Sequence, residues 1–222
     1  MEPKWQRISF MPATPLGEDG RRVTGSAAHI ALSRRAAAEG MVLLKNENET
    51  LPLKRGSRVA VFGKAQADYV KGGGGSGDTT VAYVRSLAQG LRMKQDEGKI
   101  EIFEPLERFY AEDVKAQYAA GATPGKTREP ILNDTLVQQA RAFTDTAVIT
   151  ICRFSGEDYD RTGQPHDGDY FLSFEEEHMV RKALAAFPRV AVVLNTGGMM
   201  DTIWFKDNPA VGAALLAWQG GM

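Results

Sequence analysis

Short, continuously apolar runs recur along the chain, separated by longer stretches of mixed polarity. Runs that stay apolar, rather than alternating between apolar and polar residues, are typical of parallel β-strands covered on both faces. Five such runs stand out, "RVAVFG", "IEIF", "TAVITI", "VAVVLN" and "VGAALLAW". They predict buried strands that begin at Arg58, Ile100, Thr146, Val190 and Val211.

Helical patterns lie between these runs. In the stretch from Ser173 to Phe187, Ser173 and Glu176 have the spacing of a capping box, and Pro188 follows the end of the pattern. An earlier helix is expected from Ser26 to Lys45, and others over residues 79–92, 107–120 and 133–143. The alternation predicts a doubly wound α/β fold, with a mostly parallel sheet sandwiched between helices.

Two segments fall outside this alternation. Residues 121–130, "GATPGKTREP", are rich in glycine and proline and predict a surface loop. No helical pattern follows the last predicted strand before Met222. We therefore expect that face of the sheet to be covered by another element or by a continuation of the protein.

Composition limits the classes of partner. The 222 residues are 43% hydrophobic and 25% charged, which is enough to bury a sizeable core. The 27 Lys and Arg residues balance 28 Asp and Glu residues without a block of like charges, which argues against a nucleic-acid partner or a membrane surface. The first residues lack the apolar core of a signal peptide, and no apolar stretch is long enough to span a membrane, so we expect a cytoplasmic protein.

A glycine-rich stretch, "GKAQADYVKGGGGSGDTT", leaves the strand that ends at Phe62. Such loops can cradle phosphates, but here Asp78 precedes Thr79 where a phosphate-binding loop has lysine, and Gly63 is too far from the glycine cluster for a dinucleotide fingerprint. A flexible loop and a close approach of the backbone to an uncharged ligand such as a sugar are the alternatives.

The second candidate loop, "RFSGEDYDRTG", follows the strand that begins at Thr146. A carboxyl group that exchanges a proton near neutral pH needs neighbouring negative charge or burial. Asp158 and Asp160 would supply that charge to Glu157, with Arg153 and Arg161 in reach. The alternative is that these charges merely solvate one another on a polar loop.

The remaining polar and aromatic candidates predict no metal site and no cofactor. His166 and His178 are expected at the surface, and no histidine, cysteine or carboxylate cluster has a metal-ligand spacing. Cys152 lies inside an apolar run and is expected to be a buried, inert thiol. Trp204 and Trp218 stand beside apolar runs, which favours core or interface positions over a sugar site.

Seven segments together resemble one family. They are "AAAEGMVLLKNENETLPL", "VAVFG", "GGGGSG", "RFSGEDYDR", "FLSFEEEHMVRKAL", "VVLNTGG" and "LLAWQGG". In order and spacing they are similar to the α/β sandwich domain of glycoside hydrolase family 3, of which beta-glucosidases are the best known members. The similarity covers nearly the whole chain after residue 25, so we expect a lead segment over residues 1–25 and the sandwich domain over residues 26–222.

The resemblance implies a retaining glycosidase that acts on β-linked glycosides. In this family an Asp on a TIM barrel domain attacks the anomeric carbon, and a Glu of the sandwich domain, matched here by Glu157, serves as acid and base. We expect Ser76, Asp160 and Arg161 to bind substrate. A non-catalytic sugar-binding or assembly domain of the same fold is the alternative function.

The sequence departs from the family in two respects. Asp158 stands where many relatives have glycine, and two effects are open: a changed backbone of the acid/base loop, or a raised pKa of Glu157. The barrel is absent from the chain, since the family's Ser-Asp-Trp signature occurs at none of Trp5, Trp204 and Trp218. Met1 opens a plausible natural amino terminus, and the chain stops in the middle of the family's "W.GG.EGG" segment, so we expect a reversed domain order with the barrel after Met222. We also expect the chain to be inactive by itself.

Overall fold

The computed structural model describes residues 26–75, 78 and 83–220. The chain divides into two units, residues 1–41 and 42–222. In the first unit, helix α2 (Ala27–Gly40) begins after Ser26, whose side chain accepts a hydrogen bond from the backbone N–H of His29. The predicted lead segment over residues 1–25 lies outside the described residues.

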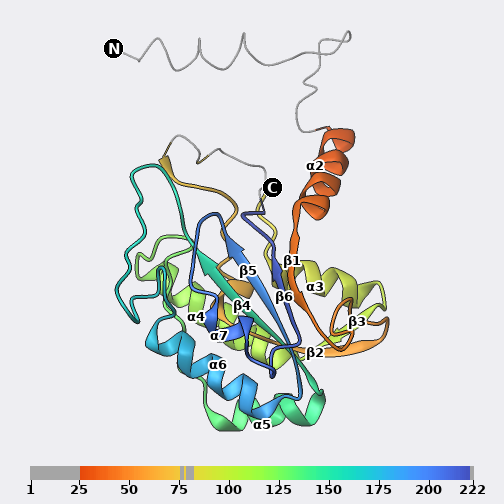
Figure 1. The fold of residues 1–222 in the computed structure, drawn as a ribbon. Helices are drawn as coiled ribbons and strands as arrows, with labels where there is room; N and C mark the ends of the chain where they lie inside the picture. The colour runs from red at the N-terminus through yellow and green to blue at the C-terminus, as the bar shows by residue number, and fades with distance from the viewer. Residues whose placement is uncertain (1–25, 76–77, 79–82, 221–222) are drawn as a thin grey trace, which may run out of the picture. The chain divides into compact units, whose positions relative to one another are not determined.

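The second unit is built on a six-stranded sheet in the order β1-β6-β5-β4-β2-β3. All neighbouring strands are parallel except the edge pair β1 and β6. The fold class predicted from the apolar runs is therefore confirmed (Figure 1). The strands are β1 (Val42–Asn46), β2 (Ser57–Phe62), β3 (Ile100–Ile102), β4 (Thr146–Arg153), β5 (Arg189–Thr196) and β6 (Ala213–Leu216).

Helices cover this sheet on both faces. Alternate residues of the central strands, including Phe62, Ile149 and Val192, form the larger core with α4, α5, α6 and α7. Val59, Val61 and Val148 face the other way and pack with Leu91 of α3. The helices are α3 (Leu87–Asp96), α4 (Glu104–Ala119), α5 (Asp134–Phe143), α6 (Phe174–Ala186) and α7 (Ile203–Lys206), with a 3₁₀ turn, η1 (Lys64–Gln66).

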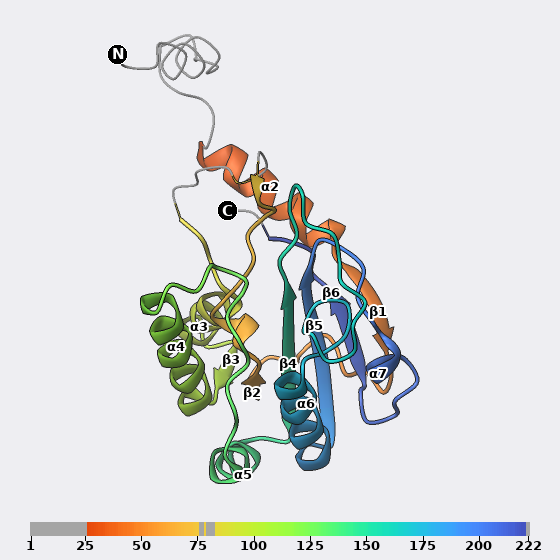
Figure 2. The same cartoon turned by 90° about the vertical axis from the view of Figure 1, so that its left-hand side faces the viewer.

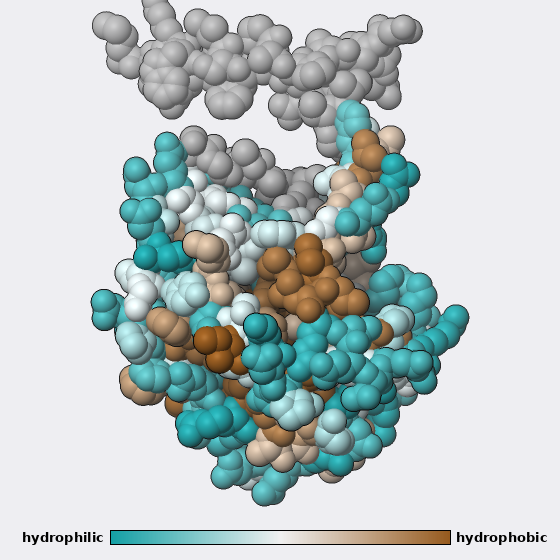
Figure 3. Space-filling model, in the orientation of Figure 1, coloured by the Kyte–Doolittle hydropathy of each residue, from teal (hydrophilic) through white to brown (hydrophobic). Residues whose placement is uncertain are grey.

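One edge of the sheet exposes apolar side chains. Val42, Leu43 and Leu44 of β1 are between 42% and 51% exposed, and Figure 3 shows a hydrophobic patch over β6 and β1. Three consecutive exposed aliphatic residues on an edge strand are unusual on a water-exposed surface, because unpaired strand edges invite association. What covers this side stays open, and the expectation that another element or a continuation of the protein covers it stays a prediction.

The first predicted helix was too long. Residues 42–46 form β1 because their backbone pairs with β6 in antiparallel register, Val42 opposite Leu216. Aliphatic residues such as Val42, Leu43 and Leu44 suit both structures, and the neighbouring strand decides between them. The helix predicted over residues 79–92 also begins later, at Leu87, where Ser86 and Gln89 form a capping box.

The capping box predicted for Ser173 and Glu176 is present, and α6 ends before Pro188. By contrast, the loop at residues 121–130 is not wholly at the surface. Thr127 and Glu129 are 5% and 4% exposed; the Thr127 hydroxyl donates to Asp68, and Oε2 of Glu129 accepts from the Lys64 N–H. Among the described residues, no helix is long and apolar enough to cross a membrane.

Candidate functional site

Two loops meet at the carboxyl edge of the sheet. The glycine loop (residues 63–78) leaves β2, and the exit loop (residues 154–172) leaves the neighbouring strand β4. In the sheet, β3 lies on one side of β2 and β4 lies on the other side. The direction in which the chain adds strands therefore reverses between β2 and β4. Open parallel sheets bind ligands at such switch points. Both Figure 1 and Figure 2 show the two loops rising side by side from this edge.

The glycine loop contacts the exit loop through its backbone. The N–H of Gly74 donates to the carbonyl of Ser155 at 3.1 Å, and Gly74 forms a parallel bridge with Gly156. A Cβ on Gly156 would lie 2.4 Å from the Gly74 nitrogen, and one on Gly75 would lie 2.6 Å from the Glu157 Cβ. The described glycines therefore permit close approach of the two loops, rather than forming a phosphate cradle.

Glu157 lies at the corner of a tight turn. The N–H of Tyr159 donates to the carbonyl of Gly156 at 3.2 Å, which closes the turn, and Glu157 is exposed. Asp158 has φ 61°, in the left-handed region that favours glycine and that aspartate tolerates better than most residues. The turn therefore keeps a glycine-type backbone even though the residue is Asp158.

Arg153 does not lie beside Glu157 as expected from sequence. Its guanidinium is 3% exposed and forms a bidentate ion pair with Glu176, with both N···O distances at 2.7 Å. Its other N–H groups donate to the carbonyls of Cys152, Asp169 and Phe171. All five donors of the side chain are thus used, and Arg153 joins the start of the exit loop to its end.

Arg161 makes a second connection across the exit loop. It donates to the Phe154 carbonyl at 2.9 Å, pairs with Asp169, and reaches the Thr196 hydroxyl at 3.3 Å. Asp160 is exposed and lines a neighbouring pocket. Ser76, the third predicted substrate-binding residue, lies outside the described residues.

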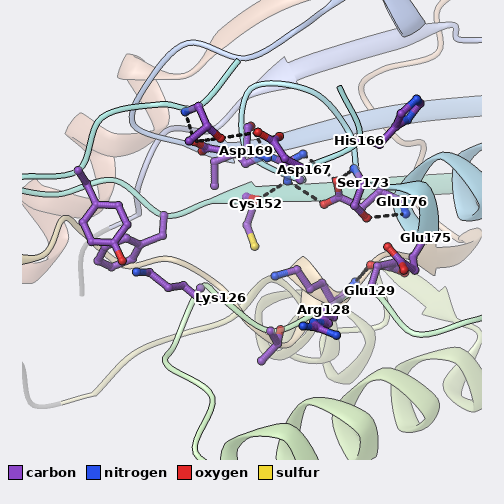
Figure 4. A pocket seen from close by; sticks show the side chains of 18 of the residues that line it. Lys126, Arg128, Glu129, Cys152, His166, Asp167, Asp169, Ser173, Glu175 and Glu176 are labelled. Atoms are coloured by element: carbon purple, nitrogen blue, oxygen red, sulfur yellow. Dashed lines mark hydrogen bonds and ion pairs between the residues drawn. The ribbon is translucent and has the colours of Figure 1, made fainter. Parts of the chain in front are cut away.

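That pocket, of about 460 Å³, lies between the exit loop and residues 125–129. Lys126, Arg128 and Glu129 lie on one side of it, Asp167 and Asp169 on the other, and the Cys152 sulfur points into it (Figure 4). Cys152 is buried as predicted, and burial raises the pKa of its thiol, which keeps it protonated and unreactive.

Asp68 anchors residues 125–127 below the exit loop. Its fully buried carboxylate accepts hydrogen bonds from the N–H of Gly125, both donors of Thr127 and the Tyr118 hydroxyl. Burial works to raise the pKa of Asp68, but Lys64 and these donors outweigh it, so the pKa stays below its ordinary value. The anchored segment carries Lys126, whose ammonium lies 3.6 Å from the ring centre of Tyr159 on the exit loop.

Asn195, near the end of β5, holds the middle of the glycine loop. Its amide accepts from the Val70 N–H at 2.7 Å and donates to the Val70 carbonyl at 3.0 Å, as a neighbouring strand would. The same amide also donates to the Trp218 carbonyl. Sequence reasoning did not single out Asn195, although an asparagine that ends an apolar strand in "VVLNTGG" is a signal for such a role.

Glu129 is a buried acid beside this pocket. Its Oε2 accepts from the Lys64 backbone N–H at 2.8 Å, whereas Oε1 has no hydrogen-bond partner among the described residues. Burial, with a smaller contribution from the negative charge of Glu176, raises its pKa to about 8. Near neutral pH the folded protein therefore holds a proton that the unfolded chain releases.

The Glu129→Gln variant should lose less stability than the parent as the pH rises from 5 to 8. In the parent, the folded carboxyl stays protonated up to a pKa of about 8 while the unfolded one titrates near 4.5, so stability falls with rising pH in this window. The limiting slope is about 1.4 kcal/mol per pH unit. Urea unfolding at pH 5, 6.5 and 8 measures the free energy of unfolding of both proteins and so its slope with pH. Glu112→Gln, at an exposed position on α4, is the control, and an equal pH dependence of Glu129→Gln and the parent would contradict the assignment.

The described residues contain no group of three or more His, Cys, Asp or Glu side chains placed to hold a metal ion. For proton transfer, this edge offers exposed carboxylates on a braced loop, foremost Glu157. A carboxylate in that setting can give a proton to a leaving group and take one from water.

Comparison with known proteins bears on this chemistry. Residues 41–222 match the model of the glycosyl hydrolase family 3 C-terminal domain. Beta-glucosidase A of Butyrivibrio fibrisolvens is 46% identical, with 99% of this chain and 29% of that protein covered. A beta-glucosidase of Ruminococcus albus is 35% identical, with 83% of this chain and 19% of that protein covered.

Solved structures agree with this match. The chain superposes on a beta-glucosidase of Paenibacillus barengoltzii with a TM-score of 0.77 and 33% identity, over 86% of this chain and 22% of that one. It superposes on beta-glucosidase 3B of Thermotoga neapolitana with the same TM-score and 34% identity, over 87% of this chain and 27% of that one. The chain thus spans less than a third of the length of each of these relatives.

Proposed function

The chain belongs to glycosyl hydrolase family 3, and from that membership we propose that it is the acid/base-bearing domain of a retaining hydrolase of β-linked glucosides or related sugars. Glu157 gives its proton to the oxygen of the leaving group, and then removes a proton from the water that releases the sugar. The observation that carries the proposal is the exposed position of Glu157, on a turn at the carboxyl edge of the sheet.

The proposed reaction needs a second carboxylate from outside this chain. Retention requires the acid/base and the nucleophile to lie about 5 to 5.5 Å apart. Glu157 is exposed on its loop. From the family resemblance we expect the nucleophile to come from a TIM barrel domain. The expected placement of that barrel after Met222 stays a prediction, as does the cytoplasmic location.

The proposal can be tested with a chimera of beta-glucosidase A in which this chain replaces the matching part. The chain is similar to that part over nearly its whole length. We expect the chimera to hydrolyse an aryl β-glucoside, and both the 222-residue chain and the remainder of beta-glucosidase A to be inactive alone. The reason is that turnover needs both carboxyl groups: the nucleophile forms the glycosyl-enzyme, and the acid/base protonates the leaving group and activates the water that releases the sugar.

Two outcomes would count against the proposal. Hydrolysis by the isolated chain would show that it carries a complete site of its own. A folded chimera that binds glucose in a titration but fails to hydrolyse the glucoside would instead favour a non-catalytic sugar-binding or assembly domain.

A further inference from the structure

We propose that Arg161 is the positioning residue for Glu157. It acts by joining two parts of the exit loop to each other and by joining the loop to β5. The inference rests on the proposed function of Glu157. Arg161 follows Glu157 by four residues, and its partner carbonyl, that of Phe154, precedes Glu157 by three. The 2.9 Å contact between them therefore closes the segment that carries Glu157.

A second contact ties this closed segment to the returning half of the loop. Arg161 pairs with Oδ1 of Asp169, while Oδ2 of Asp169 accepts from the backbone N–H of Thr162 at 2.7 Å. One carboxylate thus holds both Arg161 and the residue after it. The Asp169 carboxylate therefore holds the end of the turn against the returning half of the exit loop, while the bond from Arg161 to Phe154 holds the two ends of the turn together.

The third contact fixes the loop relative to the sheet. Arg161 reaches the hydroxyl of Thr196, the last residue of β5, at 3.3 Å. Gly198 leaves room for it, since a Cβ there would lie 3.3 to 3.4 Å from the guanidinium. A planar guanidinium can serve a carbonyl, a carboxylate and a hydroxyl at once, whereas a lysine ammonium on its flexible stem cannot hold the same three positions.

The role differs from the substrate-binding role expected from sequence. The Arg161 side chain is 19% exposed, and its contacts with Phe154, Asp169 and Thr196 all serve the fold of the loop. A substrate-binding arginine affects mainly KM when it is replaced. A positioning residue affects kcat, because a displacement of about 1 Å at a reacting group can slow turnover by roughly 100-fold.

The test uses the active chimera with four variants: Arg161→Lys, Glu157→Ala, the double variant, and Arg181→Lys as a matched control on the exposed face of α6. Arg161→Lys should lower kcat by about 10- to 100-fold and change KM by less than about 3-fold. In the Glu157→Ala background the same change should add nothing, because Arg161 acts only through Glu157. Arg181→Lys should match the parent.

Hydrogen exchange provides a readout that does not depend on catalysis. In the 222-residue chain, Arg161→Lys should speed exchange of the backbone amides at residues 155–160, while amides of β4 keep the parent rate. Unchanged exchange in the turn would overturn the proposal. So would a kcat of the double variant that falls by the product of the two single losses, or an effect of Arg161→Lys on KM rather than on kcat. A Glu157→Ala variant with full activity would instead refute the proposed function, whatever the exchange data show.

Discussion

Replacing Glu157 with alanine in the active chimera is expected to lower kcat by about 100- to 10,000-fold, the range for loss of a general acid/base. The methyl group can neither protonate the leaving oxygen nor activate water. Azide should restore part of the rate with an activated aryl glucoside, because this small anion needs no base to attack the glycosyl-enzyme. The glycosyl azide product, identified by mass spectrometry, checks that the rescue occurs at the anomeric carbon.

Asp158→Ala is the matched control, since it removes the neighbouring exposed carboxylate and leaves Glu157 in place. We expect a much smaller loss, which comes mainly from strain at the left-handed backbone position. The opposite pattern, an active Glu157→Ala variant and an inactive Asp158→Ala variant, would move the acid/base assignment by one residue.

The Arg153→Met variant is expected to be about 3 to 5 kcal/mol less stable than the parent, which is a large part of a typical domain's stability. It leaves the 3%-exposed Glu176 carboxylate without its cation, and it leaves the carbonyls of Asp169 and Phe171 without a donor. Urea unfolding followed by circular dichroism gives the difference in free energy.

Two further variants sharpen this result. Arg153→Met combined with Glu176→Leu should recover part of the loss, since no buried charge then remains. Lys94→Met, which breaks an ion pair with Glu97 that is exposed to water, should cost less than about 1 kcal/mol. A cost for Arg153→Met as small as that for Lys94→Met would show that the buried pair contributes little.

The central part of the fold could be predicted from sequence because its signals are local. Continuous apolar runs identified β2 to β6, and the Ser173 capping box identified the start of α6. The strand β1 could not be separated from the preceding helix, since Val42 to Asn46 become a strand only by pairing with residues 213–216. Pairing between distant segments leaves no periodic signal in either one.

The candidate site also has a part that could be predicted from sequence and a part that could not. The choice of Glu157 as acid/base came from the family resemblance of its segment and stays a prediction. The partners of the charged residues around it could not be predicted, because Arg153 pairs with a glutamate 23 positions away and Asp68 bonds to Thr127, 59 positions away. Burial of Glu129 in an otherwise polar loop was also hidden, since its composition resembles that of a surface segment.

The bond between Asn195 and Val70 has a consequence for the order of events during protein synthesis. The two residues are 125 positions apart, so the glycine loop cannot gain this partner until β5 has left the ribosome. At about 5 to 20 residues per second, translation alone delays that contact by roughly 6 to 25 s. Thr196, the anchor of Arg161, emerges one residue later. A nascent chain stalled between the exit loop and β5 would therefore display the turn that carries Glu157 without its anchor on β5, and that anchor would form only when translation resumes.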